Sequence, residues 1–324
     1  YHNRTSTDIA VSKLNVLQAE NLFQVDNKNT FRVGAEYRNS NTQGILVSSN
    51  GQGYVKTDLV GVSGMWEHKA TDKLTFTNSL RFDHVETEKS QDQSTGSALP
   101  EDKFDQNFDV LSFNTGAVYK LNQLESLRFN AGRGAHIPAT TEFAGDYGIT
   151  GIELAGNPDL DPEILWSAEA GYTKILPKIQ GKAKATVFFQ YIEDHLTKTI
   201  DPLTFAPAKN LEFLYSNGGT SKSVGLELAL DGKYNENLGY GSSYTFMYTD
   251  DDADVADTMF NEDNNNEHKV AVWTDYNKDK LSAHVEAIWT SGVNYKVLAN
   301  PTINALVEEK VHSYITLNTN VSYD

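Results

Sequence analysis

Residues 132–172 read GRGAHIPATTEFAGDYGITGIELAGNPDLDPEILWSAEAGY and contain a long connection between two strands that residue alternation predicts. The connection runs for roughly thirty residues, whereas loops in compact domains usually have about 4–6. Pro138 and Pro162 stand where the chain leaves one strand and enters the next, and proline fixes the backbone path at such points. The stretch is therefore predicted to be a shaped loop with a function of its own.

The composition favours one large all-β unit over two soluble domains. The 324 residues include 16 Tyr, 15 Phe and 23 Gly, and Thr, Ser and Asn are abundant, all of which suit strands and turns. No run of about 18 apolar residues is present, and the first residues, YHNRTSTD, lack the features of a signal peptide. Any crossing of a membrane is therefore expected to use strands.

The charge and the absence of cysteine exclude several classes of function. The net charge is −17, from 44 acidic and 27 basic residues, which argues against a nucleic-acid partner because phosphate neutralisation needs a basic surface. Zero cysteines exclude a disulfide framework, thiol chemistry and a cysteine metal site, and fit an oxidising compartment. The acidic surface could attract cations or could simply keep exposed loops soluble.

Apolar and polar residues alternate with a period of two along most of the chain, for example in 74–83, 182–191, 224–231 and 281–290. This period is typical of strands with one apolar face, and no helix is predicted anywhere. The predicted strands are 5–25, 30–38, 54–68, 74–87, 106–119, 125–133, 162–174, 182–197, 212–233, 238–249, 267–277, 281–291 and 312–323.

The connections between these strands alternate strictly between short turns and long loops, which places all the turns at one end of an antiparallel sheet. Outer-membrane barrels have this arrangement, and a soluble sandwich has no reason for it. Only a closed barrel satisfies every strand backbone in lipid. Aromatic residues near strand ends suit the two membrane interfaces, with packing in a soluble β core as the alternative: Trp66, Trp166, Tyr172, Tyr191, Trp273, Tyr276 and Trp289.

The predicted fold is thus a transmembrane antiparallel β-barrel. About thirteen strands is an odd number, whereas bacterial barrels have an even one, so residues 1–324 are expected to form a single domain that is part of a larger barrel.

Five segments resemble, in order, motifs of the TonB-dependent outer-membrane receptors. In that family a strand ends in GRGFRAPSxxEL, and a long loop then leads into GNPxLxPE and ExGY. The matching residues here are 132–138 with Glu142 and Phe143, 156–163 and 169–172, followed by 189–196 (FQYIEDHL), 215–217 (YSN) with 225–228 (GLEL), and 267–270 (EHKV).

The resemblance implies a barrel of about 22 strands around a globular plug, with about thirteen of them in this chain and the plug upstream of Tyr1. It implies active transport of an extracellular nutrient across the bacterial outer membrane, with a ferric siderophore as the expected substrate. The implied partners are the TonB system, a small-molecule metal chelate, and outer-membrane lipid and lipopolysaccharide. A diffusion porin and a surface-exposed binding or adhesion barrel are the alternatives.

The family's Phe-Arg pair is replaced here by Ala135 and His136, so a role carried by that arginine is not transferred. No histidine occurs between Ile137 and Gly156, which disfavours haem, because haem receptors of the family usually carry one there. The acidic residues 250–252, 254 and 257 lack the calcium-loop pattern and are read as a solvated loop, or as a divalent-cation bridge to lipopolysaccharide.

The sequence contains no catalytic motif such as GxSxG or HExxH and no phosphate-binding glycine loop, so no enzyme activity, cofactor or metal site is expected. Ligand contacts are expected in the long loops, where Tyr and Arg suit recognition surfaces, although any single loop residue can lack a ligand contact. The candidates are Arg133, His136, Glu142, Tyr147 and, across the barrel mouth, Tyr295 and Lys296.

Overall fold

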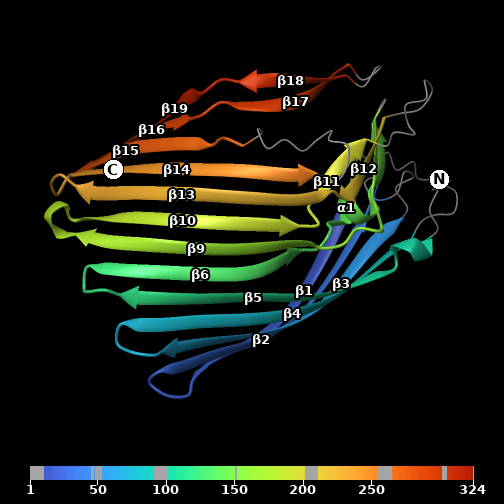
Figure 1. Ribbon diagram of the computed structural model, residues 1–324, viewed down its shortest axis with the longest axis horizontal. Helices are drawn as coiled ribbons and strands as arrows, with labels where there is room; N and C mark the ends of the chain where they lie inside the picture. The colour runs from blue at the N-terminus through green and yellow to red at the C-terminus, as the bar shows by residue number, and fades with distance from the viewer. Residues whose placement is uncertain are drawn as a thin grey trace.

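The computed structural model describes residues 11–44, 47, 53–90, 101–149, 152–200, 211–253, 265–300 and 305–323. Its main feature is one sheet of 13 strands in the order β1-β2-β3-β4-β5-β6-β9-β10-β13-β14-β15-β16-β19. Neighbouring strands are antiparallel, and β1 to β3 pass behind β4 and β5 in the view of Figure 1. Within the described residues the edge strands β1 and β19 do not pair with each other, so the barrel wall is open.

Each of the 13 strands lies where the alternation predicts one, and the prediction of an all-β antiparallel wall is confirmed. The strands are β1 (Val11–Gln24), β2 (Asn29–Gln43), β3 (Tyr54–Lys69), β4 (Leu74–Ser90), β5 (Gln106–Lys120), β6 (Glu125–His136), β9 (Glu163–Leu176), β10 (Gly181–Glu193), β13 (Gly219–Lys233), β14 (Leu238–Ala253), β15 (His268–Lys278), β16 (Leu281–Thr290) and β19 (Tyr314–Tyr323).

The sheet has one apolar and one polar face, as alternation requires. Val187 and Phe189 of β10 lie on the apolar face and are 53% and 43% exposed. The opposite face carries charges that pair with one another, as Arg81 does with Asp83 at 2.6 Å and with Glu36 at 3.3 Å. Because the lipid-facing side of a membrane barrel is apolar, we call the first the outer face and the second the lumen face.

The short turns lie together at one end of the wall (Figure 1), and polar side chains close them locally. Asp26 accepts hydrogen bonds from the backbone N–H groups of Lys28 and Asn29 at 2.7 and 2.8 Å. Asn235 accepts two such bonds at 2.9 Å in the turn between β13 and β14. These side-chain bonds replace backbone turn bonds, so the local sequence specifies the turns.

The long-loop end carries small elements that the sequence did not predict. The expectation of no helix is wrong, because α1 (Thr140–Ala144) and the 3-10 turn η1 (Glu101–Phe104) are present there, and a second 3-10 turn, η2 (Pro177–Ile179), lies in the short turn between β9 and β10. No helix in the described part of the chain is long and apolar enough to cross a bilayer. Short strands form a sheet ordered β11-β12-β8-β7 and a hairpin β17-β18: β7 (Asp146–Ile149), β8 (Ile152–Ala155), β11 (Leu196–Ile200), β12 (Leu211–Asn217), β17 (Val293–Asn300) and β18 (Ala305–Val311).

The run predicted as one strand over 212–233 is two strands. β12 ends at Asn217 and β13 begins at Gly219, whose φ of 125° belongs to a region that glycine adopts readily. At this point the chain leaves the small sheet and enters the wall. Similarly, the predicted strand 182–197 leaves the wall after Glu193.

A cluster of buried apolar side chains lies at the loop end. Val55, Phe104, Phe143 and Ala144, with Val47, are at most 3% exposed and pack η1 and α1 against the wall. Lys89 of β4, itself 5% exposed, donates to the carbonyl of Ala144 at 3.1 Å, and its Nζ lies 4.5 Å from the centre of the Phe104 ring. The loop end is therefore anchored by a core of its own.

Aromatic side chains gather near both ends of the strands. At the turn end, Phe23, Phe31 and Trp66 form a stacked row with ring centres 5.8 and 6.3 Å apart. At the loop end, Phe113 meets Trp166 edge to face at 5.8 Å. Amphipathic rings at these two levels suit the two membrane interfaces.

Trp273 does not belong to either belt. It lies on the lumen face, over Gly241 of β14, where a Cβ atom would overlap the indole ring. Trp273 alternates with Val272 of the outer face, so the prediction that it faces an interface is wrong.

Candidate functional site

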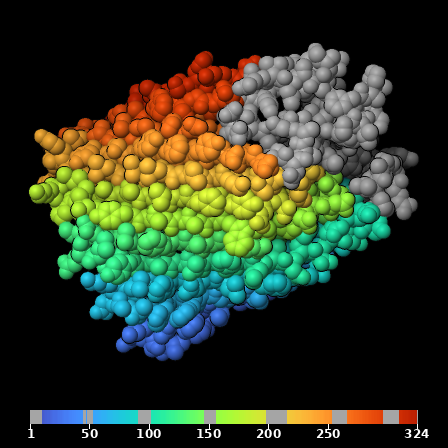
Figure 2. Space-filling model, viewed as in Figure 1, coloured from blue at the N-terminus to red at the C-terminus, as the bar shows by residue number. Residues whose placement is uncertain are grey.

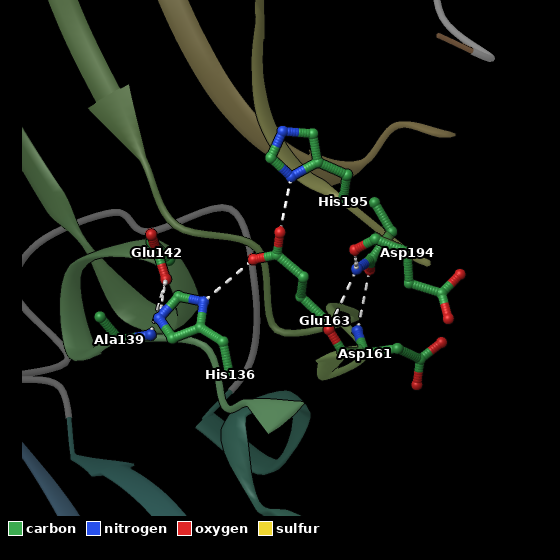
Figure 3. Close-up of polar contacts among 8 residues, drawn as sticks. His136, Ala139, Glu142, Asp161, Glu163, Asp194 and His195 are labelled. Atoms are coloured by element: carbon green, nitrogen blue, oxygen red, sulfur yellow. Dashed lines mark hydrogen bonds and ion pairs between the residues drawn. The ribbon is translucent and has the colours of Figure 1, made fainter. Parts of the chain in front are cut away.

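Three side chains from separate segments meet at the loop end of the lumen face (Figure 3). Glu163 begins β9, His136 ends β6 directly opposite it, and His195 follows β10. Nδ1 of His195 lies 2.6 Å from one carboxylate oxygen of Glu163, and Nδ1 of His136 lies 3.2 Å from the other. Both imidazoles therefore donate to one carboxylate, and we call these three residues the mouth cluster.

The mouth cluster favours the ionised form of Glu163. This side chain is 14% exposed and lies at the loop end of β9, beyond the membrane-spanning part of the strand. Burial acts to raise the pKa of Glu163, but the hydrogen bonds and charges of His195 and then of His136 outweigh it and hold the pKa below its ordinary value. A charged carboxylate thus joins the two imidazoles.

Helix α1 is attached to the mouth cluster through Glu142. One oxygen of this carboxylate accepts the backbone N–H of Ala139 at 2.7 Å and lies 3.9 Å from Nε2 of His136. Ala139 is the N-cap of α1, and a Glu three residues after the cap is the position from which a carboxylate reaches back to it. The same carboxylate therefore starts the helix and faces the cluster.

Asn217 clamps the two segments that flank the mouth cluster. Its amide nitrogen donates to the carbonyls of Asp161 at 3.0 Å and Asp194 at 2.8 Å, and its amide oxygen accepts the N–H of Asp161 at 2.9 Å. Only a side chain with both donors and an acceptor can make this set, which explains an amide at this position.

Asn157 docks the long loop on β12 and α1. Its side chain donates to the carbonyl of Tyr215 at 2.9 Å, and its backbone N–H donates to the carbonyl of Glu142 at 2.8 Å. Next to it, Gly156 donates to Gly145 at 2.7 Å, and β8 pairs in parallel with β12. The segments with the GNP and YSN motifs therefore hold each other.

Asp194 is an unfavourable charge in this arrangement. It adopts a φ of 54°, in the left-handed region that a non-glycine residue uses rarely. Burial, followed by the negative charges of Asp161 and Glu193, raises the pKa of Asp194 above its ordinary value. The mouth thus contains one carboxylate that its surroundings stabilise and one that they do not.

Of the predicted ligand-binding residues whose side chains the structure describes, His136 and Glu142 lie together. Arg133 lies on the outer face, where its guanidinium stands 5.7 Å from the centre of the Trp166 ring and donates to the carbonyl of Leu111. This position is separate from the mouth cluster.

The other three predicted residues lie in short strands at the loop end. Tyr147 is in β7, and Tyr295 and Lys296 are in β17 opposite Glu309 and Glu308 of β18. The side chains of Tyr147, Tyr295 and Lys296 lie outside the described part of the structure.

Sequence reasoning did not single out Glu163, His195 or Asn217 as site residues. Each stands in one of the segments that resemble family motifs, and that was the available signal. Among the residues that the structure describes, no group of three or more histidine and carboxylate side chains is arranged to hold a metal ion.

Comparison with known proteins identifies the family. The family model described as TonB dependent receptor-like, beta-barrel, matches residues 2–324. No match was found among curated protein sequences.

Solved structures share the fold at low sequence identity. The copper transporter OprC has a TM-score of 0.72 at 12% identity, with 97% of this chain and 49% of that chain covered. The FrpB iron transporter from Neisseria meningitidis (F3-3 variant) has a TM-score of 0.69 at 13% sequence identity, and the match covers 97% of this chain and 48% of that chain. The siderophore receptor PiuA from Acinetobacter baumannii has a TM-score of 0.67 at 17% sequence identity, and the match covers 97% of this chain and 50% of that chain.

The chain thus spans about half the length of these structures. Their wall of antiparallel strands corresponds to the 13-stranded sheet, and the family model covers nearly every residue. This chain belongs to the TonB-dependent receptor-like β-barrel family, whose members are outer-membrane proteins of Gram-negative bacteria.

Proposed function

We propose that this chain is the barrel wall and extracellular mouth of a TonB-dependent transporter that imports a ferric siderophore. The observation that carries the proposal is the mouth cluster with its clamp, because Glu163 and Asn217 join two long loops into one unit over the lumen. Loops held in this way form a defined surface for an extracellular ligand. The family match supports TonB as the source of energy.

The barrel performs no covalent chemistry in this proposal. A bound ligand can shift the equilibrium of the loops and the plug only if it binds two of their states with different affinity. The TonB system then acts on the plug, and the chelate passes into the periplasm. The siderophore class is proposed from the family and from the sequence resemblance.

His136 and Glu142 are the proposed ligand contacts at the mouth. The His136 side chain is 53% exposed, and its Nδ1 is engaged by Glu163, which fixes the ring and directs Nε2 towards α1. A fixed imidazole edge is suited to hydrogen bonding with the oxygen-rich shell of a ferric chelate. Tyr147, Tyr295 and Lys296 stay predictions for ligand contact, whereas Arg133 is assigned below to the lipid-facing surface.

Binding of ferric siderophores to the full-length receptor tests the substrate class. A panel of ferric catecholates and hydroxamates is titrated while tryptophan fluorescence is followed. One class is expected to bind, and His136→Ala is expected to weaken it by about tenfold, which corresponds to about 1.4 kcal/mol. His84→Ala is the matched control, because this histidine is similarly exposed but contacts Asp109 on the outer face.

Two outcomes contradict the proposal. If no ferric siderophore binds, the substrate class is wrong. If the full-length protein instead forms a constantly open channel in planar bilayers, with conductance unchanged by any of these chelates, it is a diffusion porin.

A further inference from the structure

One row of the outer face carries two cations on aromatic rings. Arg133 of β6, Trp166 of β9, Tyr191 of β10 and Lys222 of β13 are successive cross-strand partners. The guanidinium carbon of Arg133 lies 5.7 Å from the centre of the Trp166 ring, and Nζ of Lys222 lies 5.9 Å from that of Tyr191. These four residues are called the cationic row.

The cationic row marks the loop-side limit of the apolar face. On its turn side the next cross-strand row is apolar and consists of Ala131, Ala168, Phe189 and Val224. Amphipathic aromatic rings and basic side chains prefer the level of lipid headgroups. Because long loops are extracellular in outer-membrane barrels, this level belongs to the outer leaflet.

A groove of about 540 Å³ lies in the apolar face on the turn side of the cationic row. Small side chains open it, since alanines occupy neighbouring positions on three strands. Its lining includes Ala117, Ala131, Ala168 and Ala170 between the larger Phe76, Phe129, Val187 and Phe189. In a bilayer a hydrocarbon chain fills such a groove, because an empty one would lose dispersion contacts. Figure 2 shows the broad face formed by these central strands.

The two cations have no carboxylate partner among the residues that the structure describes. Arg133 donates to the carbonyl of Leu111, and Asp250 is the cross-strand neighbour of Lys222 without forming an ion pair with it. At the level of the headgroups, a guanidinium or ammonium group without a protein carboxylate can pair with the phosphate of a lipid. In a chain with a net charge of −17, this basic row points to an anionic partner.

We propose that this face binds lipopolysaccharide, with lipid A phosphates at Arg133 and Lys222 and one acyl chain in the groove. Three strand spacings separate the two residues, which is about 14 Å between their Cα atoms. A single phosphate does not span this separation, whereas a disaccharide phosphorylated at both ends does. Charge, spacing and an adjoining apolar groove thus fit one lipid class.

Native mass spectrometry of the full-length receptor tests the proposal. The protein is delipidated by detergent exchange and titrated with diphosphoryl lipid A, monophosphoryl lipid A and phosphatidylglycerol. Diphosphoryl lipid A is expected to bind about tenfold more tightly than either of the others, a difference that the Arg133→Gln/Lys222→Gln double variant abolishes. Ala168→Trp is expected to weaken binding while leaving both cations in place.

The matched control is Arg128→Gln/Lys184→Gln, which makes the same charge changes on the lumen face of β6 and β10. It is expected to bind lipid A as the wild type does. The proposal is overturned if the Arg133/Lys222 double variant retains wild-type binding, or if phosphatidylglycerol binds as tightly as diphosphoryl lipid A. Transport is not measured, so this result is independent of the proposed function.

Discussion

Nδ1 of His195 lies 2.6 Å from the carboxylate of Glu163, although the whole β9-β10 hairpin separates these residues in the chain. The bond links the first residue of a wall strand to the segment that leaves the wall towards β11. With His136 on the other oxygen at 3.2 Å, Glu163 becomes the point where two loops meet. This arrangement makes the mouth testable by single substitutions.

Glu163→Gln is expected to weaken the hydrogen bonding that holds the mouth cluster together. A neutral amide offers one acceptor oxygen, so one imidazole loses its partner, and a hydrogen bond to a charged group contributes about 1.5–3 kcal/mol. Amide hydrogen exchange at Gly218, which donates to the His195 carbonyl at 2.8 Å, should accelerate by about tenfold or more. Glu169→Gln, on the same face of β9, is the control, and equal protection in both variants would contradict the role of Glu163.

Asn217→Asp is expected to destabilise the long loops more than Asn217→Ala does. Alanine only removes the three hydrogen bonds to Asp161 and Asp194, whereas aspartate also places a charge that cannot donate against two carbonyl oxygens. Losing these bonds should cost about 1–3 kcal/mol. Protease cleavage of the long loops in folded receptor measures the effect, and equal cleavage of aspartate and alanine variants would show that the amide donors are unimportant.

Asp194→Asn is expected to stabilise the receptor at neutral pH. The folded structure raises the pKa of Asp194, so the ionised form destabilises the fold, and asparagine removes this charge while tolerating the φ of 54°. The difference in urea midpoint should be near zero below the ordinary pKa of 3.8 and grow as pH rises through the folded-state value. Asp159→Asn, at an exposed position in the long loop, serves as the control. A pH-independent difference would contradict the electrostatic cause.

Lys89 and Phe104 are expected to be coupled. The Lys89 ammonium lies 4.5 Å from the centre of the Phe104 ring in a buried site, where such a contact is worth about 2 kcal/mol. A double-mutant cycle of Lys89→Met and Phe104→Leu, read from urea unfolding, should give a coupling energy above about 0.5 kcal/mol. Strictly additive effects would mean that the cation and the ring act independently.

The wall could be predicted from the sequence because its signals are local. In β10, Ala183 to Tyr191 alternate with polar residues, and Asp26 and Asn235 close turns through their own side chains. The local sequence of each strand therefore predicts both its alternation and its ends. The prediction that Trp273 lies at a membrane interface is wrong because an aromatic residue near a strand end can lie on either the outer face or the lumen face.

The mouth could not be predicted because its contacts are not local. Strands of four or five residues show no measurable period, and the parallel pairing of β8 with β12 joins distant segments. The break before Gly219 interrupts an alternation that continues in the sequence. Arg133 was grouped with His136 by proximity in the chain, but strand geometry sends the two side chains to opposite faces.

The most direct test of the proposed transport is the initial rate of radiolabelled ferric siderophore uptake by cells that make the full-length receptor, compared with and without TonB. We predict uptake that saturates with ligand and falls to background when TonB is absent. Uptake that continues unchanged without TonB, or is equal in cells without the receptor, would contradict it.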